Sequence, residues 1–220
     1  MDRICRRLFL LGLTTFGAAE LVAFSVAADV PLDLEFMLHA RFFSDETRQP
    51  APLDPQVFVA DEAAQGGIGP QGIQHESGLR PARFSDPGTA PLHNAHGRPL
   101  GFNLADWFAA RGTARVKQAV AGEMATCRFS FLRPHGLYSL FENHFDQKPI
   151  GFTPLDGTAA HNSFRADGAG SAHVELSVAR ALTHENALLL VYHSDDATHG
   201  MSRGAIGVTA HHQLIAPIPG

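Results

Sequence analysis

Hydrophobic and polar residues alternate along several stretches of the chain, the pattern of a β-strand with one buried face. The first stretch runs from Leu32 to Phe43, with Leu34 and Phe36 on the apolar side and His39 on the polar side. We therefore expect a half-buried strand over residues 32–43, with His39 in solvent. A second, short strand is expected over residues 56–59.

The β pattern is densest after Ala125. Alternation predicts strands over residues 125–131, 137–141, 162–166 and 172–178, and the sequence Asp-Gly-Ala-Gly at 167–170 predicts a hairpin turn between the last two. The run Ala187–Tyr192 is apolar throughout, which indicates a central strand buried on both faces. One or two final strands are expected between Gly204 and Ile215.

Residues 60–101 have no such periodicity and are rich in turn-forming pairs such as Gly69-Pro70 and Pro87-Gly88. We interpret this segment as a long irregular loop. Leu104–Arg111 predicts one short helix that ends before Gly112. About six to nine short strands with at most one short helix predict an all-β fold, an antiparallel β-sandwich or jelly roll, formed as a single domain by residues 30–220.

Charge and composition exclude one class of function. The 220 residues include 17 Lys and Arg against 22 Asp and Glu, a formal net charge of −5. The basic residues do not cluster with aromatic ones, so we expect no nucleic-acid partner. The unusual count is histidine, with 13 residues beside 2 Tyr and 1 Trp.

Residues 1–28 have the pattern of a cleaved export signal. Arg3, Arg6 and Arg7 precede an apolar run that begins at Leu8 and ends in Ser-Val-Ala-Ala at 25–28, small residues that suit a signal peptidase. Glu20 within the apolar run favours a signal over a membrane anchor. An uncleaved N-terminal anchor is the alternative.

The start of this signal, Cys-Arg-Arg-Leu-Phe-Leu-Leu at 5–11, resembles the twin-arginine export signal. Arg6, Arg7, Phe9 and Leu10 match that family's pattern, whereas Cys5 and Leu11 depart from it. The resemblance implies a periplasmic or secreted protein that folds before export, often with a cofactor. An ordinary secretory signal that contains two arginines is the alternative. After cleavage we expect no membrane span. We also expect no intramolecular disulfide, because Cys127 is then the one cysteine left.

The main candidate site follows the predicted buried strand. Continued alternation places His193 at the strand end, on the same face as Leu189 and Val191, with Asp195 and His199 in the loop that follows. Imidazole with carboxylate suits a transition metal ion such as copper, zinc or iron. Adjacent strand residues face opposite sides, so only one of His211 and His212 can supply a further ligand, and we favour His211.

The same residues have a structural alternative, in which Asp195 caps a turn and the histidines donate to nearby carbonyls. The pair of His193 and Asp195 is similar to the two-His-one-carboxylate motif of non-haem iron oxygenases. We reject that family as a model, because its distal histidine precedes a substrate-binding arginine and no arginine follows Arg203 here. His93 with His96 lacks further ligands nearby in sequence. Glu142 with Asp146 or Asp156 is a candidate acid–base pair for a sugar substrate, but paired carboxylates are common at strand ends. Ser194 beside His193 does not form a triad, since strand neighbours point apart.

Three functions follow from these residues. The first is an exported β-sandwich protein that binds a transition metal through His193, Asp195, His199 and His211, with a redox or hydrolytic role. The second is a non-enzymatic periplasmic or extracellular module that binds a small molecule, a glycan or a protein. The third is a histidine-based response to pH between about 5 and 7.

Overall fold

The computed structural model describes residues 31–119 and 122–220, so the predicted export signal lies outside the described residues. The elements follow one another in this order: β1 Leu32–Leu38, α1 His39–Glu46, β2 Leu53–Ala60, β3 Gly67–Ile68, a 3₁₀ turn Pro70–Gly72, β4 Gln74–His75, β5 Leu79–Arg83, β6 Pro91–His93, β7 Pro99–Asn103, α2 Leu104–Ala109, β8 Arg111–Ala119, β9 Gly122–Ser130, β10 Leu137–His144, β11 Gly151–Pro154, β12 Ser163–Arg165, β13 Ala172–Val178, β14 Asn186–His193 and β15 Ala210–Pro217.

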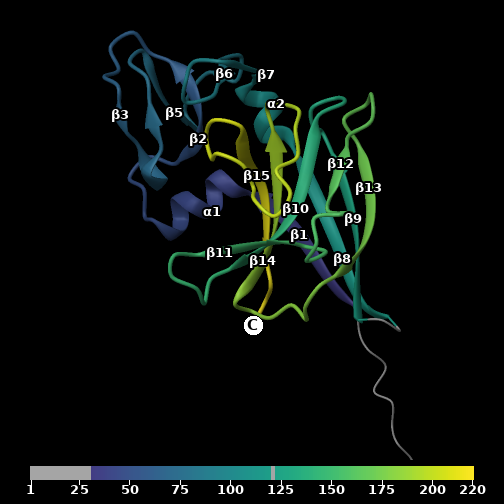
Figure 1. Ribbon diagram of the computed structural model, residues 1–220. Helices are drawn as coiled ribbons and strands as arrows, with labels where there is room; N and C mark the ends of the chain where they lie inside the picture. The colour runs from purple at the N-terminus through teal and green to yellow at the C-terminus, as the bar shows by residue number, and fades with distance from the viewer. Residues whose placement is uncertain (1–30, 120–121) are drawn as a thin grey trace, which may run out of the picture.

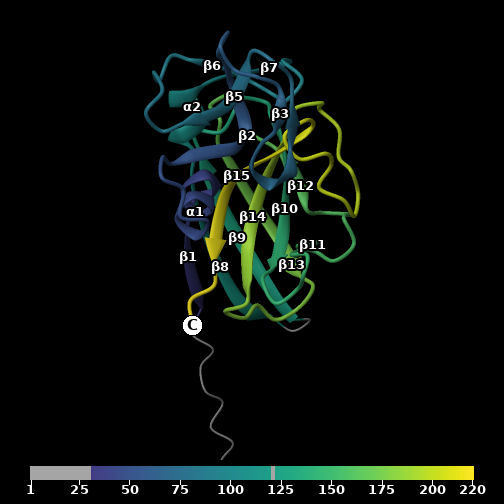
Figure 2. The ribbon, with the colours of Figure 1, turned by 90° about the vertical axis from the view of Figure 1, so that its left-hand side faces the viewer.

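The all-β prediction is confirmed. Nine strands form a curled antiparallel sheet in the order β11-β10-β14-β15-β1-β8-β9-β13, and β12 pairs with the other half of β10 along the same edge as β11 (Figures 1 and 2). A four-stranded sheet, β5-β2-β6-β7, lies above one end of the larger sheet. Strands β3 and β4 form a third, two-stranded sheet.

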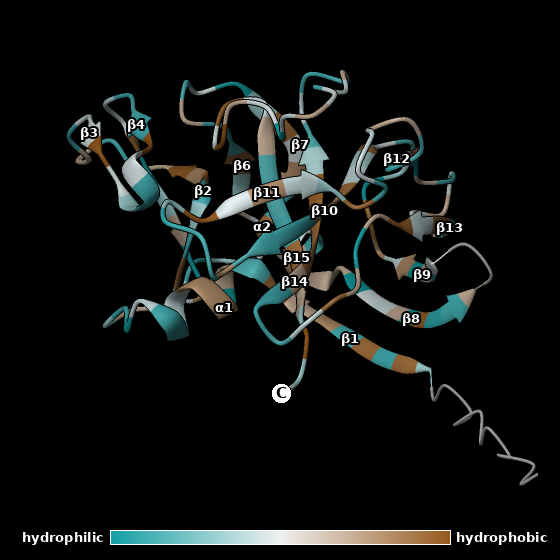
Figure 3. Ribbon diagram, turned by 60° about the horizontal axis from the view of Figure 1, so that its bottom comes forward, coloured by the Kyte–Doolittle hydropathy of each residue, from teal (hydrophilic) through white to brown (hydrophobic). Residues whose placement is uncertain are grey.

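The two halves of the large sheet are buried differently. Strands β1, β8, β9 and β13 alternate between buried and more exposed residues, so one of their faces meets solvent. Figure 3 shows the matching alternation of hydrophobic and hydrophilic residues along β1. Strand β14 is buried along its whole length, between β10 and β15. This confirms the central strand predicted from the apolar run. Its inward side, with Leu188, Leu190 and Tyr192, joins the main core. Its outer side, with Leu189 and Val191, packs under Phe42, Phe145 and Phe152.

The strand predicted over residues 32–43 ends early. Strand β1 stops at Leu38 and α1 begins at His39, so the described residues form two short α-helices, where at most one was predicted. In α1, His39, Ala40 and Ser44 are buried, the spacing of a helix face, and α1 packs on β15 and β2. The prediction that His39 lies in solvent is therefore wrong. Among the described residues, no helix is both long and apolar enough to cross a membrane.

Residues 60–101 are also more regular than predicted. They contain β3 to β6 and the start of β7, and contribute to both smaller sheets. The strands are two to five residues long, and several contain proline, which hides their periodicity. Pro81 and Pro99 lie in β5 and β7, the two edges of the four-stranded sheet, where a missing N–H is tolerated.

Candidate metal centre

The candidate site forms where β14 ends and the loop 194–209 leads to β15. His193, the last residue of β14, lies opposite Leu137 on β10 and Ala210 on β15. It shares the outer face with Leu189 and Val191, as the alternation predicted. The loop is tied to the strand end by Ser194, whose backbone N–H donates to the carbonyl of Thr209 at 2.9 Å.

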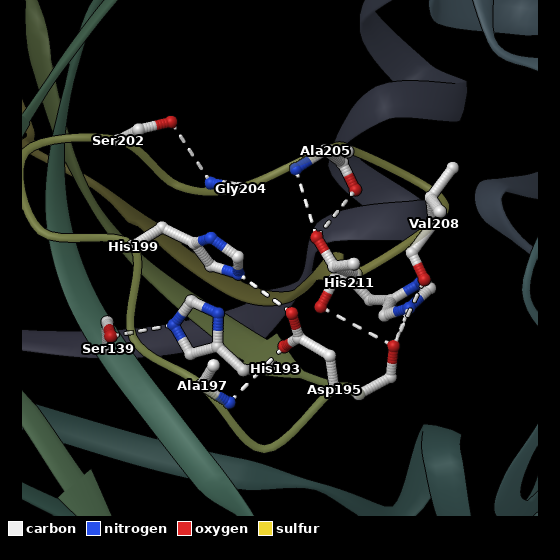
Figure 4. A network of polar contacts seen from close by, with 12 residues as sticks. Ser139, His193, Asp195, Ala197, His199, Ser202, Gly204, Ala205, Val208 and His211 are labelled. Carbon is white, nitrogen blue, oxygen red and sulfur yellow. Dashed lines mark hydrogen bonds and ion pairs between the residues drawn. The ribbon is translucent and has the colours of Figure 1, made fainter.

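The fold brings three of the four predicted ligands together. His193, Asp195 and His199 each offer one ligand atom, and these atoms all lie within 4.8 Å of one another. Nε2 of His199 lies 3.2 Å from Oδ2 of Asp195, and the rings of His193 and His199 are 5.5 Å apart between centroids. Figure 4 shows the two rings beside the Asp195 carboxylate. His193 is buried, whereas Asp195 and His199 are half-buried, so the group lies just beneath the surface.

A chain of hydrogen bonds fixes the proton on His193. Nε2 of His193 lies 2.7 Å from Oγ of Ser139, which lies 2.8 Å from Oγ of Ser163. Ser163 donates to Oδ1 of Asn162, whose Nδ2 donates to the carbonyl of Leu140. One assignment of protons satisfies all of these contacts together. In it the hydroxyl of Ser163 donates to Asn162, the hydroxyl of Ser139 donates to Ser163, and Nε2 of His193 donates to Ser139.

The opposite nitrogen of His193 is therefore left with a free lone pair. Nδ1 is buried and has no hydrogen-bond partner among the described residues. Burial, helped by repulsion from His199 and opposed by attraction to Asp195, lowers the pKa of His193 to about 4. At neutral pH the ring is uncharged, and Nδ1 is a Lewis base rather than a proton donor.

His199 has a second buried nitrogen of this kind. Its Nε2 is close enough to Asp195 for an ion pair, but the contact lacks hydrogen-bond geometry and Nε2 has no other partner among the described residues. Oδ1 of Asp195 accepts from the backbone N–H of Ala197 at 3.3 Å, which holds the carboxylate in the turn. Two imidazole nitrogens and one carboxylate thus converge without satisfying one another's hydrogen-bonding capacity.

His211, the fourth predicted ligand, lies outside this group. It faces the inner side of β15, opposite Tyr192. Its Nδ1 is 2.9 Å from the carbonyl of Gln56, and its Nε2 is 3.0 Å from Oγ of Ser194. Both ring nitrogens are therefore in use. His212 faces the other side, where its ring contacts Gln56, Arg203 and His39.

The other candidates lie apart from this site. Nδ1 of His93 is buried without a partner, but neither His93 nor His96 belongs to a group of ligands among the described residues. Glu142 is buried 3.5 Å from Nδ1 of His144, and burial raises the pKa of Glu142. Cys127 is buried in β9, and burial raises the pKa of its thiol to about 12, as expected of a core residue. Sequence analysis missed Ser139, the partner that orients His193.

Comparison with models of known protein families gives no match for this chain. Comparisons with curated proteins and with solved structures give no significant match either.

Proposed function

We propose that the protein binds one transition metal ion, copper, zinc or iron, through Nδ1 of His193, a carboxylate oxygen of Asp195 and Nε2 of His199. The observation that carries the proposal is the pair of buried imidazole nitrogens without hydrogen-bond partners, together with one carboxylate within 4.8 Å. Leaving such nitrogens unsatisfied costs about 1–3 kcal/mol each. A bound cation would use both lone pairs and be partly neutralised by Asp195.

The arrangement around His193 is the one expected of a metal ligand. In metal sites, the nitrogen of a ligating histidine that faces away from the ion usually donates to a neighbouring acceptor, which fixes the tautomer. Ser139 is that acceptor here. Ligand atoms around tetrahedral zinc lie roughly 3.3 Å apart, for bonds of about 2.0 Å. The group must therefore contract, and the half-buried loop residues Asp195 and His199 are the ones free to move.

Three protein ligands leave a coordination position for water or substrate, as in catalytic metal sites. This supports a redox or hydrolytic role over purely structural binding, because structural sites are usually closed by four protein ligands. The partial exposure of Asp195 and His199 leaves that position open to solvent.

No specific observation favours a glycan-binding or protein-binding module. The exposed large hydrophobic side chains among the described residues are Met37, Ile68, Phe131, Ile150 and Met201, which come from separate elements and include one aromatic residue. Single apolar residues of this kind are normal on a protein surface.

The proposal is tested by metal content and by titration. The mature protein would be purified without a chelator or a histidine tag, and its metal measured by mass spectrometry; the chelator-stripped protein would then be titrated with Zn²⁺ in a calorimeter. We expect about one equivalent in both measurements. Protein that emerges metal-free and takes up no Zn²⁺, Cu²⁺ or Fe²⁺ while folded would refute the proposal.

Replacing Ser139 by alanine removes the hydrogen bond that orients His193 but no ligand. We expect Zn²⁺ affinity to fall about 10-fold to 100-fold, the usual effect of losing an outer-shell partner. Competition with a chromogenic chelator measures this change. Ser177→Ala, an exposed serine on β13, is the matched control and should keep wild-type affinity. Equal affinity in Ser139→Ala and wild type would contradict the assigned tautomer.

We also propose that the protein is exported in a folded state through its twin-arginine-like signal, with cleavage after Ala28. Changing Arg6 and Arg7 together to lysine should abolish export, because the pair carries the resemblance. Fractionation followed by N-terminal sequencing measures the effect. The wild-type protein should begin at Asp29, and Arg3→Lys should leave export unchanged. Undiminished export of the double variant would indicate an ordinary secretory signal.

A further inference from the structure

A second feature of the outer face is a cavity of about 510 Å³. Its lining residues come from α1, β10, β11, β15 and neighbouring loops. Figure 2 shows α1 and β11 on opposite sides of β15 and β14. Phe42 of α1, Phe145 and Phe152 of β11 supply aromatic walls, and Phe42 stacks on Phe145 at 5.7 Å between centroids. Its size and its lining match those of small-molecule pockets, which measure roughly 300–1,000 Å³.

One charged group, Arg203, dominates the polar part of the lining. Its guanidinium carbon lies 3.1 Å from the centroid of the Phe152 ring, and its Nη1 is 2.9 Å from Nε2 of His212. Burial lowers the pKa of Arg203 to about 10, so it remains charged at neutral pH. Among the described residues, no carboxylate lies within ion-pair distance of this guanidinium.

The remaining titratable groups of the cavity do not neutralise Arg203. His39 and His212 are buried beside it, and burial holds the pKa of His39 at about 3 and that of His212 well below its usual range, so both rings are neutral. Glu46, the last residue of α1, lines the cavity but is exposed at its rim. The interior thus holds one net positive charge, within an apolar wall.

Two further polar atoms of lining residues lack partners. Oδ1 of Asn143 and Nδ1 of His39 are both buried without a hydrogen bond among the described residues. The amide oxygen of Asn143 can only accept, so it requires a donor from elsewhere. A half-buried guanidinium with unused N–H groups, in turn, matches the planar geometry of a carboxylate.

We propose that this cavity binds a small monocarboxylate with an aromatic or similarly flat apolar body. The carboxylate lies against Arg203, the body packs among Phe42, Phe145 and Phe152, and a hydroxyl or amine on the body donates to Asn143. The site is separate from the metal centre, although Arg203 and His199 belong to the same loop. Ligand binding here does not depend on a metal ion.

The test compares phenylacetate with its uncharged isostere phenylacetamide, using the mature protein in EDTA so that no metal ion can bind the carboxylate. Ligand-observed NMR titration gives both dissociation constants. We expect phenylacetate to bind at least about tenfold more tightly than the amide, through the charge-assisted contact with Arg203. Because this comparison uses the unaltered chain, it does not depend on any variant folding.

Variants then locate the site. Arg203→Met should remove the preference for the acid over the amide, and Arg203→Lys should retain part of it. Arg128→Met is the control, because it removes the same positive charge at an exposed position of β9 and should keep the preference. His193→Ala should bind phenylacetate like wild type, which separates this proposal from the metal centre. Equal affinity for acid and amide, an undiminished preference in folded Arg203→Met, or no binding of either probe at about 10 mM would each overturn the proposal.

Discussion

Changing His193 to alanine is expected to lower Zn²⁺ affinity by more than about 100-fold, because losing a ligand exceeds the loss caused by an outer-shell change. His193 is the most deeply buried residue of the group, and its ring is held in place by Ser139. Competition with a chelator measures the affinity, and near-ultraviolet circular dichroism checks that the variant is folded.

The rest of the series distinguishes ligands from neighbouring histidines. Asp195→Asn keeps the size of the side chain but removes its charge, and His199→Ala removes the second free nitrogen; both should weaken Zn²⁺ binding strongly. His173→Ala, from an exposed His–Glu pair on β13, should bind like wild type. A folded His193→Ala that binds as tightly as His173→Ala would exclude the centre.

A variant of His211 tests the fourth ligand that the sequence predicts. Its two ring nitrogens are taken by Gln56 and Ser194 in the structure, so we expect folded His211→Gln to retain one equivalent of Zn²⁺. Loss of the metal from this variant, with His173→Ala unaffected, would instead make His211 a ligand and require its ring to turn away from Ser194.

The location of the centre could be predicted from the sequence because it depends on local rules. A strand repeats every two residues, so the buried run before His193 determined which face that ring occupies. Asp195 and His199 follow within six residues of His193 in the loop after the strand. Ser139 could not be predicted in this way, because it meets His193 only through the pairing of β10 with β14, 54 residues apart.

The errors in the fold prediction have a similar origin. Residues 39–43 continue the alternation of β1, yet they form a helix because His39, Ala40 and Ser44 can then pack together against neighbouring strands. Tertiary packing overrides the local pattern here. In β2, pairing with β5 is interrupted between Asp54 and Phe58, where Pro55 cannot donate to the ladder. Such short, interrupted strands show no clear period in the sequence.

Acid is expected to destabilise the fold sharply between pH 7 and pH 5, even without metal. His39 has a pKa of about 3, His193 and His211 each have one of about 4, and that of His212 lies well below its usual range, in each case chiefly through burial. In the unfolded chain these rings titrate near 6.5. As the pH falls through 6.5, the unfolded state therefore binds protons that the native state does not bind, and the free energy of unfolding decreases.

The expected size of this effect is large compared with the stability of a domain. His39, His193 and His211 each remove about 2 kcal/mol by pH 5, at about 1.4 kcal/mol per pH unit below 6.5, and His212 acts in the same direction. Asp54 opposes them, because burial raises its pKa to about 6 and the native state gains a proton there. Protonation of Asp54 in the native state adds about 1 kcal/mol to the free energy of unfolding over the same interval. The net loss of about 5 kcal/mol compares with a typical total of about 5–15 kcal/mol.

Urea unfolding of the mature protein in EDTA, at intervals from pH 8 to pH 4, measures this dependence. The midpoint should be constant above pH 7 and fall steeply below about 6.5, with an unchanged slope of free energy against urea. The variant His39→Gln lacks one histidine that binds a proton only in the unfolded state, so its stability should decline less steeply as the pH falls. The control His173→Gln, at an exposed position, should show the same pH dependence as wild type. A midpoint that stays level down to pH 5 would mean that these rings accept protons in the native state, and that the packing of α1 against β15 opens to admit them.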